Sequence, residues 1–313
     1  MRPRHRPPTG HLAVDWRKGL SYNKFRMTVL TDSPPQEWVA DLDFERIGPF
    51  RRALKQYLIH PFSNHFPAAA IRTALRLLGS ELAHANWTDP GGWQSMVISY
   101  QDRRKRLADK LLCTLGTIPM ALRNRRRLAA RVLARLIDAH DADTPHVLCL
   151  GAGPGHIIND ALRQARRRAH ATLVDLSAGA CEYGKRLARS NGHGERMRFI
   201  QGDILDVHRM LDRPPDIVKM LGICEYIPDA PLTAIVRTVA DVMPLGSTIV
   251  FNSLSDTHGT DRFFRRVFGL HMIHRSPDQL QALMGPAGFG DFVALPEPLG
   301  VYHVVIGHRT CSA

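Results

Sequence analysis

From His146 onward, short apolar runs alternate with longer segments in which apolar residues recur every three or four positions. The first pattern predicts buried strands and the second predicts amphipathic helices. Strands that alternate with helices need crossover connections, so we expect an α/β fold with a largely parallel sheet covered on both faces. Only a short Pro-Glu-Pro segment joins the last two runs, which predicts a hairpin. The expected strands are residues 146–150, 171–175, 197–201, 216–221, 247–252, 289–294 and 301–307.

The part of the chain before His146 has a helical pattern instead. We expect an amphipathic helix over residues 68–82, a loop over 86–92, and two further helices over 93–115 and 119–139. Residues 1–40 are rich in Pro, Arg and polar groups, and they predict a loosely ordered basic arm.

The composition narrows the class of protein. The 313 residues are 44% hydrophobic, which is enough for a real core in one large or two modest domains. No apolar run reaches the ~18 residues of a membrane-spanning helix, and the N-terminus lacks the apolar stretch of a secretory signal. We therefore expect no membrane association. The cysteines form no C-x-x-C pair, which argues against a metal site or a disulfide framework and favours a reducing cytoplasm; they are Cys113, Cys149, Cys181, Cys224 and Cys311.

The net charge of +13 is concentrated in two segments. Residues 1–26 carry seven basic side chains against one acid, and residues 102–135 carry eleven against two. Such segments can bind nucleic acid, but solvated helix faces have the same composition. The charge pattern leaves both interpretations open.

A glycine-rich turn follows the first predicted strand, in the order Gly151-Ala152-Gly153-Pro154-Gly155. Glycine permits positive φ angles and a close approach of the backbone to a ligand. The spacing differs from the dinucleotide signature G-x-G-x-x-G, because the third small residue, Gly155, comes one position early and His156 stands at the place of the third glycine. No Lys-Ser or Lys-Thr follows, which excludes a phosphate-binding P-loop.

Two acids follow at the ends of the next two strands. Asp175 ends the second strand, and a carboxylate there suits a bidentate hydrogen bond to ribose hydroxyls. The alternative is a helix N-cap, a role that Ser177 can also take. Asp203 follows the third strand in a Gly-Asp pair, where an exposed turn residue is the alternative.

With these landmarks in this order, the chain from about Leu128 to His308 resembles the class I S-adenosylmethionine (SAM) methyltransferases. The resemblance implies SAM as cofactor and a Rossmann-like, seven-stranded, mostly parallel sheet with an antiparallel last strand. It also implies three regions: an arm over 1–40, a helical lid over 41–127 and a SAM-binding domain over 128–313. The residues that it assigns to the cofactor are Gly151, Ala152, Gly153, Gly155, Asp175, Leu176, Asp203, Ile204, Leu221 and Gly222.

A finer resemblance connects the chain to a bacterial group of these enzymes with a G-x-x-[DE]-Y-[LI] signature, here Gly222–Ile227. That group also has an N-R-R-R-L helix, here residues 124–128, a polar stretch at 252–255, and a His-Arg-Ser segment at 274–276. The chain lacks the [DNS]-P-P-[YF] motif of amino-directed DNA and protein methylases. It also departs from the family at Cys149, where an acid is usual; we expect this cysteine to be a small buried hydrophobe.

Candidates for the methyl-acceptor pocket come after the fourth and fifth strands. Glu225 and Tyr226 are expected to line it, with Glu225 able to stabilise a sulfonium or accept a proton. His258, with His271 and His274 nearby, is a candidate base because histidine titrates near neutral pH. In related enzymes a helix like the one that begins near Tyr100 covers the pocket, and Arg103 or Arg104 is placed to pair with the carboxylate of SAM.

The predicted function is a SAM-dependent methyltransferase that acts on a small molecule, with specialised biosynthesis as the setting and no metal. Two alternatives stay open. One is attack at the aminocarboxypropyl carbon of SAM, which releases methylthioadenosine and transfers or cyclises the chain. The other is RNA or DNA methylation, with the basic segments holding phosphates. A homodimer is an open expectation.

Overall fold

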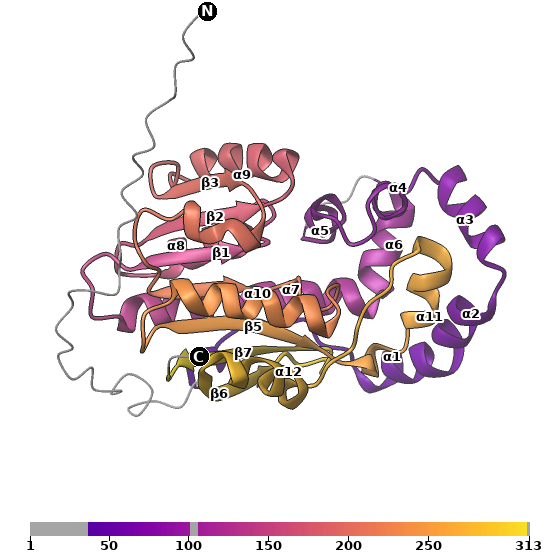
Figure 1. Cartoon of the computed structure of the whole chain (residues 1–313). Coiled ribbons are helices and arrows are strands. Elements are labelled where there is room, and N and C mark those ends of the chain that lie inside the picture. The colour runs from indigo at the N-terminus through magenta and orange to yellow at the C-terminus, as the bar shows by residue number, and fades with distance from the viewer. Residues whose placement is uncertain (1–36, 101–105, 312–313) are drawn as a thin grey trace, which may run out of the picture.

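The computed structural model describes residues 37–100 and 106–311, and its centre is a single seven-stranded sheet (Figure 1). The strand order is β3-β2-β1-β4-β5-β7-β6. Strands β1 to β5 pair in parallel, and β7 is antiparallel to both β5 and β6, which confirms the predicted topology. The strands are β1 (His146–Leu150), β2 (His170–Asp175), β3 (Met197–Gln201), β4 (Ile217–Met220), β5 (Thr248–Leu254), β6 (Phe289–Pro296) and β7 (Tyr302–Arg309).

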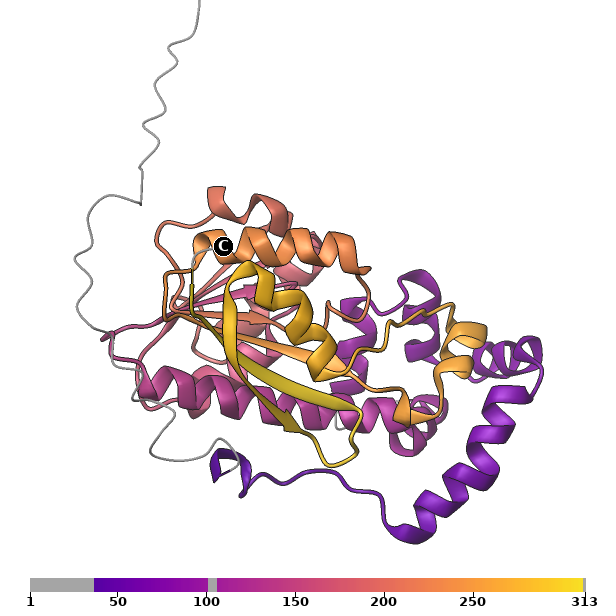
Figure 2. The same cartoon turned by 60° about the horizontal axis from the view of Figure 1, so that its bottom comes forward.

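Helices cover both faces of the sheet, as the alternating pattern predicted. One face packs on α7 (Thr117–Ala139), α8 (His156–Gln164) and α9 (Ala178–Ser190), and the other on α10 (Asp229–Val242) and α12 (Pro277–Met284). Figure 2 shows α7 running along its face of the sheet. Because β1 lies between β2 and β4, the strand order reverses there, and open α/β sheets bind ligands outside the carboxyl ends of the strands at such a point.

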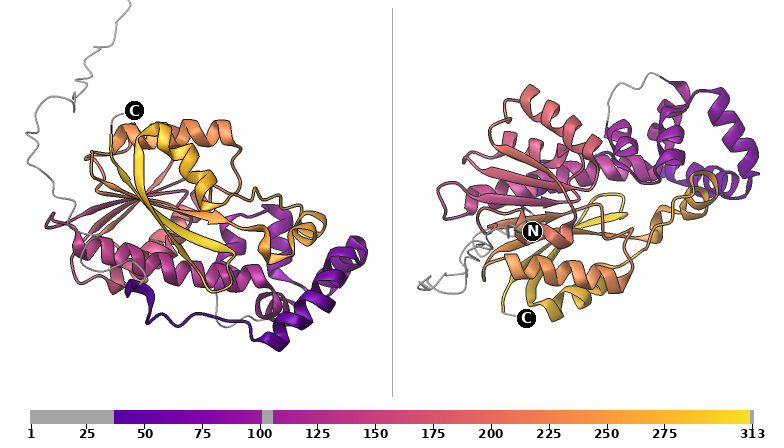
Figure 3. Two further views of the ribbon diagram at one scale, coloured as in Figure 1. Left: turned by 90° about the horizontal axis from the view of Figure 1, so that it is seen from below. Right: turned by 45° about the horizontal axis from the view of Figure 1, so that its top comes forward.

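The N-terminal helices stand to one side of the sheet (Figure 3). Next to them lies a segment that follows β5, made of η4 (Asp256–His258), α11 (Asp261–Phe263) and η5 (Phe264–Phe268). The helices are α1 (Pro49–Leu54), η2 (Lys55–Ile59), α2 (His60–His65), α3 (Ala68–Leu77), α4 (Glu81–Thr88), α5 (Trp93–Tyr100) and α6 (Leu107–Leu115). Short 3-10 segments complete the fold: η1 (Glu37–Val39), η3 (Ile204–Arg209) and η6 (Gly285–Ala287).

The helix predicted over 68–82 is two helices. Gly79 has a φ of +59°, and Ser80 begins α4 by accepting a hydrogen bond from the Ala83 amide. The buried carboxylate of Asp109 accepts from the Ser80 hydroxyl at 2.6 Å and from the first two amides of α4. This capping stabilises the start of α4. The helix ends at Thr88, so it includes the first residues of the loop expected over 86–92.

The helix predicted over 93–115 also appears as two, α5 and α6. The break expected at Gly116 is present, because its backbone is extended and α7 begins at Thr117. The basic arm predicted over 1–40 falls almost wholly outside the described residues, as do Arg103 and Arg104. None of the helices in the described part of the chain is both long enough and apolar enough to cross a membrane.

Candidate functional site

The glycine-rich turn adopts backbone conformations that favour glycine. Gly151, Gly153 and Gly155 have φ angles of +52°, +55° and +76°. A Cβ at Gly155 would lie 2.5 Å from a methyl carbon of Leu173, and one at Gly151 would lie 2.4 Å from Ile223. At Gly153 the nearest atom would be 3.8 Å away, because this residue faces open space beside Trp93. The turn therefore presents bare backbone to a cavity.

Asp175, at the end of β2, holds this turn in place. One carboxylate oxygen accepts from the Gly153 amide at 2.7 Å, and the other accepts from the Ser177 amide at 2.9 Å. Ser177 is the residue that caps α9, through a hydrogen bond from the Ala180 amide. Asp175 also lines the cavity, so its remaining lone pairs are available to a ligand.

A cavity of about 370 Å³ lies beside the turn, within the size range of sites for small molecules and cofactors. We refer to it as the glycine-turn cavity. The turn and the ends of β1, β2 and β4 form its floor, and Trp93, Met96 and Tyr100 of α5 cover it. Of the predicted cofactor residues, those that line it are Gly151, Ala152, Gly153, Gly155, Asp175, Leu176, Leu221 and Gly222. Asp203 and Ile204 lie past the end of β3 outside this lining, where Asp203 caps η3.

A buried charged network supports the floor of this cavity. Arg125 of α7 lines the cavity, and its Nη1 lies 3.0 Å from a carboxylate oxygen of Glu225; both side chains are 2% exposed. Asn252, at the end of β5, accepts from the Gly222 amide at 2.7 Å and contacts the other Glu225 oxygen at 3.4 Å. The Arg125 guanidinium also lies over the Tyr302 ring, 4.5 Å from its centroid. Three motif regions predicted from the sequence thus meet here.

The loop after β4 is fixed from below by the predicted His-Arg-Ser segment. Arg275 donates to the carbonyl oxygens of Cys224 and Ile227 at 2.6 and 2.9 Å, and it pairs with Asp229 at the start of α10. With its carboxylate engaged by Arg125, Glu225 lines neither the glycine-turn cavity nor a second cavity, which lies between the N-terminal helices and residues 260–272. Tyr226 lines both cavities. Glu225 therefore contacts the floor of the glycine-turn cavity through Arg125 and does not face that cavity itself.

The second cavity, of about 230 Å³, lies between the N-terminal helices and residues 260–272. We refer to it as the apolar cavity, since its walls include Leu82, Leu111, Leu122, Phe263, Phe268 and Met272. Polar side chains also stand in the walls, among them His60, Asn86 and Thr260. Gly91, Met96 and Tyr226 line both cavities, so the two spaces adjoin at these residues.

Two predicted histidines pair with each other next to the apolar cavity. His258 is 1% exposed, and its Nε2 lies 3.1 Å from Nε2 of His274. Its Nδ1 contacts the Thr260 hydroxyl at 2.9 Å. Burial, together with His274, lowers the pKa of His258 to about 4. The cavity walls include Thr260 but not His258, and His271 is exposed.

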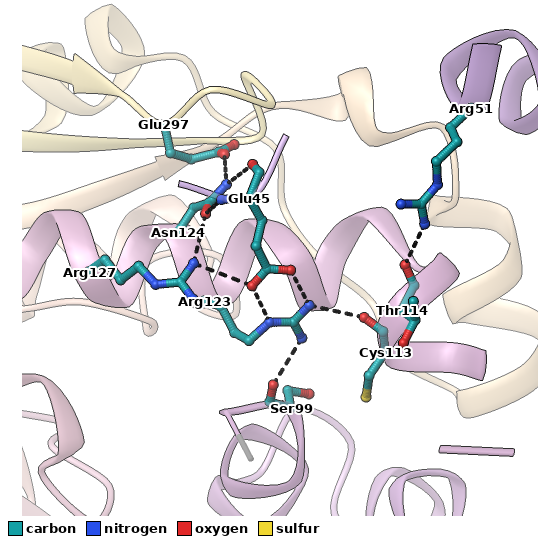
Figure 4. Close-up of polar contacts among 9 residues, drawn as sticks. All are labelled: Glu45, Arg51, Ser99, Cys113, Thr114, Arg123, Asn124, Arg127 and Glu297. Atoms are coloured by element: carbon teal, nitrogen blue, oxygen red, sulfur yellow. Dashed lines mark hydrogen bonds and ion pairs between the residues drawn. The ribbon is translucent and has the colours of Figure 1, made fainter. Parts of the chain in front are cut away.

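Arg123 holds together the segments that cover the cavities (Figure 4). Its guanidinium makes two bonds to the Glu45 carboxylate, at 2.5 and 2.6 Å, and donates to the carbonyl oxygens of Ser99 and Cys113 at 3.1 Å each. Next to it, the Asn124 amide group pairs with the backbone of Glu45 and donates to the buried Glu297 carboxylate. The N-terminal segment, α5 and α6 are therefore all fastened to α7.

Several residues of this site were not predicted. The N-R-R-R-L motif pointed to α7 but not to the roles of Arg123 and Arg125, since periodicity cannot tell a buried arginine from an exposed one. Trp93 and Met96 gave no signal beyond their helical spacing. The sequence pattern places Lys219 in a strand and gives no sign of a further role. In the structure it lines the glycine-turn cavity beside Cys149.

Comparisons with known proteins agree with this geometry. Residues 147–246, from β1 to the turn before β5, match the family model of a methyltransferase domain. No curated protein sequence matches the chain.

Solved structures share the fold at low sequence identity. A possible exported protein from Bordetella parapertussis has a TM-score of 0.59 and 16% identity, over 85% of this chain and 100% of that one. Magnesium protoporphyrin IX methyltransferase from Synechocystis PCC 6803, with bound S-adenosylhomocysteine (SAH), has a TM-score of 0.52 and 13% identity, over 76% and 99%. Mitomycin 7-O-methyltransferase has a TM-score of 0.51 and 16% identity, over 81% of this chain and 76% of that one. At these identities the likeness shows the fold alone.

Proposed function

Since this chain carries a class I SAM-dependent methyltransferase domain, we propose that it transfers the methyl group of SAM to a small, largely apolar molecule bound in the apolar cavity. The observation that carries this proposal is the shared boundary of the two cavities at Gly91, Met96 and Tyr226. A cofactor in one cavity and an acceptor in the other would meet there.

The glycine-turn cavity fits the cofactor in three respects. It has a bare backbone floor, an acid at the end of β2 placed for ribose hydroxyls, and cationic groups at Arg125 and Lys219. We propose that Trp93, Met96 and Tyr100 cover the bound cofactor, and that Leu176 packs against its adenine. When bound, SAM supplies an activated methyl group on a sulfonium.

The protein's part in the reaction is to position the acceptor and to exclude water. We propose that Tyr226, at the boundary of the two cavities, orients the acceptor toward the cofactor, and that Glu225 keeps Arg125 and the loop after β4 in place. Alignment of two reactants in a dry site accounts for a large part of such a rate enhancement. His258 faces His274, so we propose no direct contact between His258 and the acceptor.

The direct test is the nucleoside formed from SAM with a panel of small aromatic and aliphatic acceptors. We expect SAH together with a methylated acceptor. Methylthioadenosine formed without an acceptor would instead identify attack on the aminocarboxypropyl chain, for which the missing acid at Cys149 leaves room. If neither nucleoside forms with any acceptor, the proposal fails.

A matched pair of variants on α6 tests the acceptor cavity. Leu111 lines the apolar cavity and is 49% exposed, whereas Leu107, one turn earlier and 63% exposed, does not line it. We expect Leu111→Trp to reduce turnover at least tenfold by filling the cavity, with SAH affinity unchanged, and Leu107→Trp to keep both. Equal activity of the two variants in SAH-release assays would place the acceptor elsewhere.

We also propose a reducing cytoplasm as the compartment, because Cys113, Cys149, Cys181, Cys224 and Cys311 are all free thiols.

A further inference from the structure

Lys219 carries a buried amino group that faces the glycine-turn cavity without a paired carboxylate in the described part of the chain. Burial lowers the pKa of this group and Arg125 lowers it further, whereas the carboxylates of Asp175 and Glu225 favour its charged form. Lys219 lies at the centre of the sheet, on β4, and is 4% exposed. It lines the cavity, and within residues 37–100 and 106–311 its Nζ has neither a hydrogen-bond partner nor an ion-pair partner. An unpaired buried charge is costly, and an apolar residue would be the stable choice on such a strand. A ligand that supplies an anion would remove this cost.

The neighbours of Lys219 indicate which part of a bound ligand would contact its amino group. Its β1 neighbour in the sheet register is Cys149, two residues before the glycine turn. Arg125 lines the same cavity, so this region holds two basic side chains, and among the described residues only Arg125 has a carboxylate partner. Asp175, the acid suited to ribose hydroxyls, ends β2. The cationic region is therefore suited to the amino-acid part of the cofactor, where the carboxylate is the anionic group.

We infer that Lys219 is the anchor for the α-carboxylate of the methionine part of SAM, a role that rests on the assignment of SAM as the cofactor. A charge-assisted hydrogen bond from a buried ammonium to a carboxylate is among the stronger polar contacts available in a protein. Lys219 is then a positioning residue, because it fixes the end of the chain from which the sulfonium projects.

This role also accounts for Cys149. An acid at that position would stand beside Lys219 in the sheet and would neutralise it. Cys149 is fully buried, and burial raises the pKa of its thiol to about 11, so the residue is neutral. A neutral residue here leaves the ammonium available to the cofactor.

A role for Lys219 as the base that deprotonates the acceptor fits the structure less well. The walls of the apolar cavity do not include Lys219, and residues of α5 and the loop after β4 stand at the boundary between the cavities.

The test compares two ligands that differ only in the carboxylate: SAH and S-adenosyl-3-thiopropylamine, its decarboxylated form. Binding is measured by calorimetry on the full chain, with no acceptor present, so the result does not depend on which acceptor is methylated. We expect the wild-type protein to prefer SAH by roughly tenfold to a hundredfold, which is the usual range for a hydrogen bond to a charged group. In Lys219→Met this preference should disappear, and Lys219→Arg should restore part of it.

Three results would overturn the inference. The first is a wild-type protein that binds both ligands equally, which needs no variant and so does not depend on whether Lys219→Met folds. The second is an equal loss of affinity for both ligands in Lys219→Met, as expected of a purely structural residue. The third is unchanged SAH affinity with reduced turnover in that variant, as expected of a base. As a further arm, Cys149→Asp should lower SAH affinity selectively, because the new acid competes for the ammonium.

Discussion

At the scale of single residues, the site depends on groups whose charge is set by burial. Arg125 and Glu225 form a buried ion pair, whereas His156 and His258 are held neutral. The pKa of His156 falls to about 4 through burial and the nearby Arg126, and that of His258 falls to about 4 through burial and His274. Protons therefore bind more readily to these two imidazoles in the unfolded chain.

This difference predicts a loss of stability in acid. For a histidine with a folded pKa of about 4 and an ordinary value of 6.5, the contribution to stability is complete above pH 6.5 and is lost as the pH falls toward 4. For His258 we expect about 2 kcal/mol less unfolding free energy at pH 5 than at pH 7, measured with denaturant. His258→Gln should remove this part of the pH dependence, and the exposed His271→Gln should not. Parallel pH profiles for the wild type and His258→Gln would contradict the assignment.

At the scale of elements, α7 organises the helical region. Arg123 binds the segment around Glu45 and the last turns of α5 and α6 at once, so the cover of the glycine-turn cavity depends on one guanidinium. Tyr100 directly follows Ser99, whose carbonyl accepts from Arg123, and the Arg126 guanidinium lies over the Tyr100 ring, 5.0 Å from its centroid.

We expect Arg123→Ala to destabilise the protein by about 2 kcal/mol, because it leaves Glu45 and two carbonyl groups without their main donor. The loosened α5 should also weaken SAH binding. Arg127→Ala is the matched control, since Arg127 contacts the same carboxylate at 3.3 Å from a side chain that is 38% exposed, and it should cost well under 1 kcal/mol. Thermal unfolding and calorimetry of both variants decide the matter; similar losses in the two would show that Arg123 has no special role.

The sequence predicts the strands of the sheet better than it predicts the helical region around α7. The strands were predictable because each is a continuous apolar run between turn signals, and the glycine spacing with Asp175 located the glycine-turn cavity. The helical region was less predictable: the capping of α4 by Asp109 joins residues 28 and 29 positions apart, which no local pattern contains. The roles of Arg123, Arg125 and Lys219 were hidden for a related reason. Whether a cation is solvated or buried depends on partners brought by distant parts of the chain, such as Glu45 and Glu225.

At the scale of the whole molecule, the ion pairs of α7 make its arginines less available to the phosphates of a nucleic acid. Arg123, Arg125, Arg126, Arg127 and Arg131 each pair with a carboxylate of this chain. Their charge is therefore largely neutralised within the fold, which favours a small molecule over phosphates as the partner of this region.

A homodimer stays a prediction, and the exposed side chains of the helical region suggest where to test it. Phe50, Tyr57 and Leu77 are 75–83% exposed, and apolar surface of this kind often marks an interface. We expect sedimentation analysis to show a dimer that the double variant Phe50→Asp, Tyr57→Asp converts to a monomer. Leu205→Asp, on η3 in the cofactor-binding half, is the control and should leave the assembly unchanged. A monomeric wild-type protein would refute the prediction.

The continuity of α7 has a consequence for redesign. Leu122 stands in the wall of the apolar cavity and Arg125, one turn later, in that of the glycine-turn cavity. A substitution on this helix therefore alters both cavities, the proposed sites of the methyl donor and the acceptor, at once. Variants with new acceptor preferences should be sought instead on α6 and in residues 260–272. Substitutions there can change the shape of the apolar cavity without altering the lining of the glycine-turn cavity.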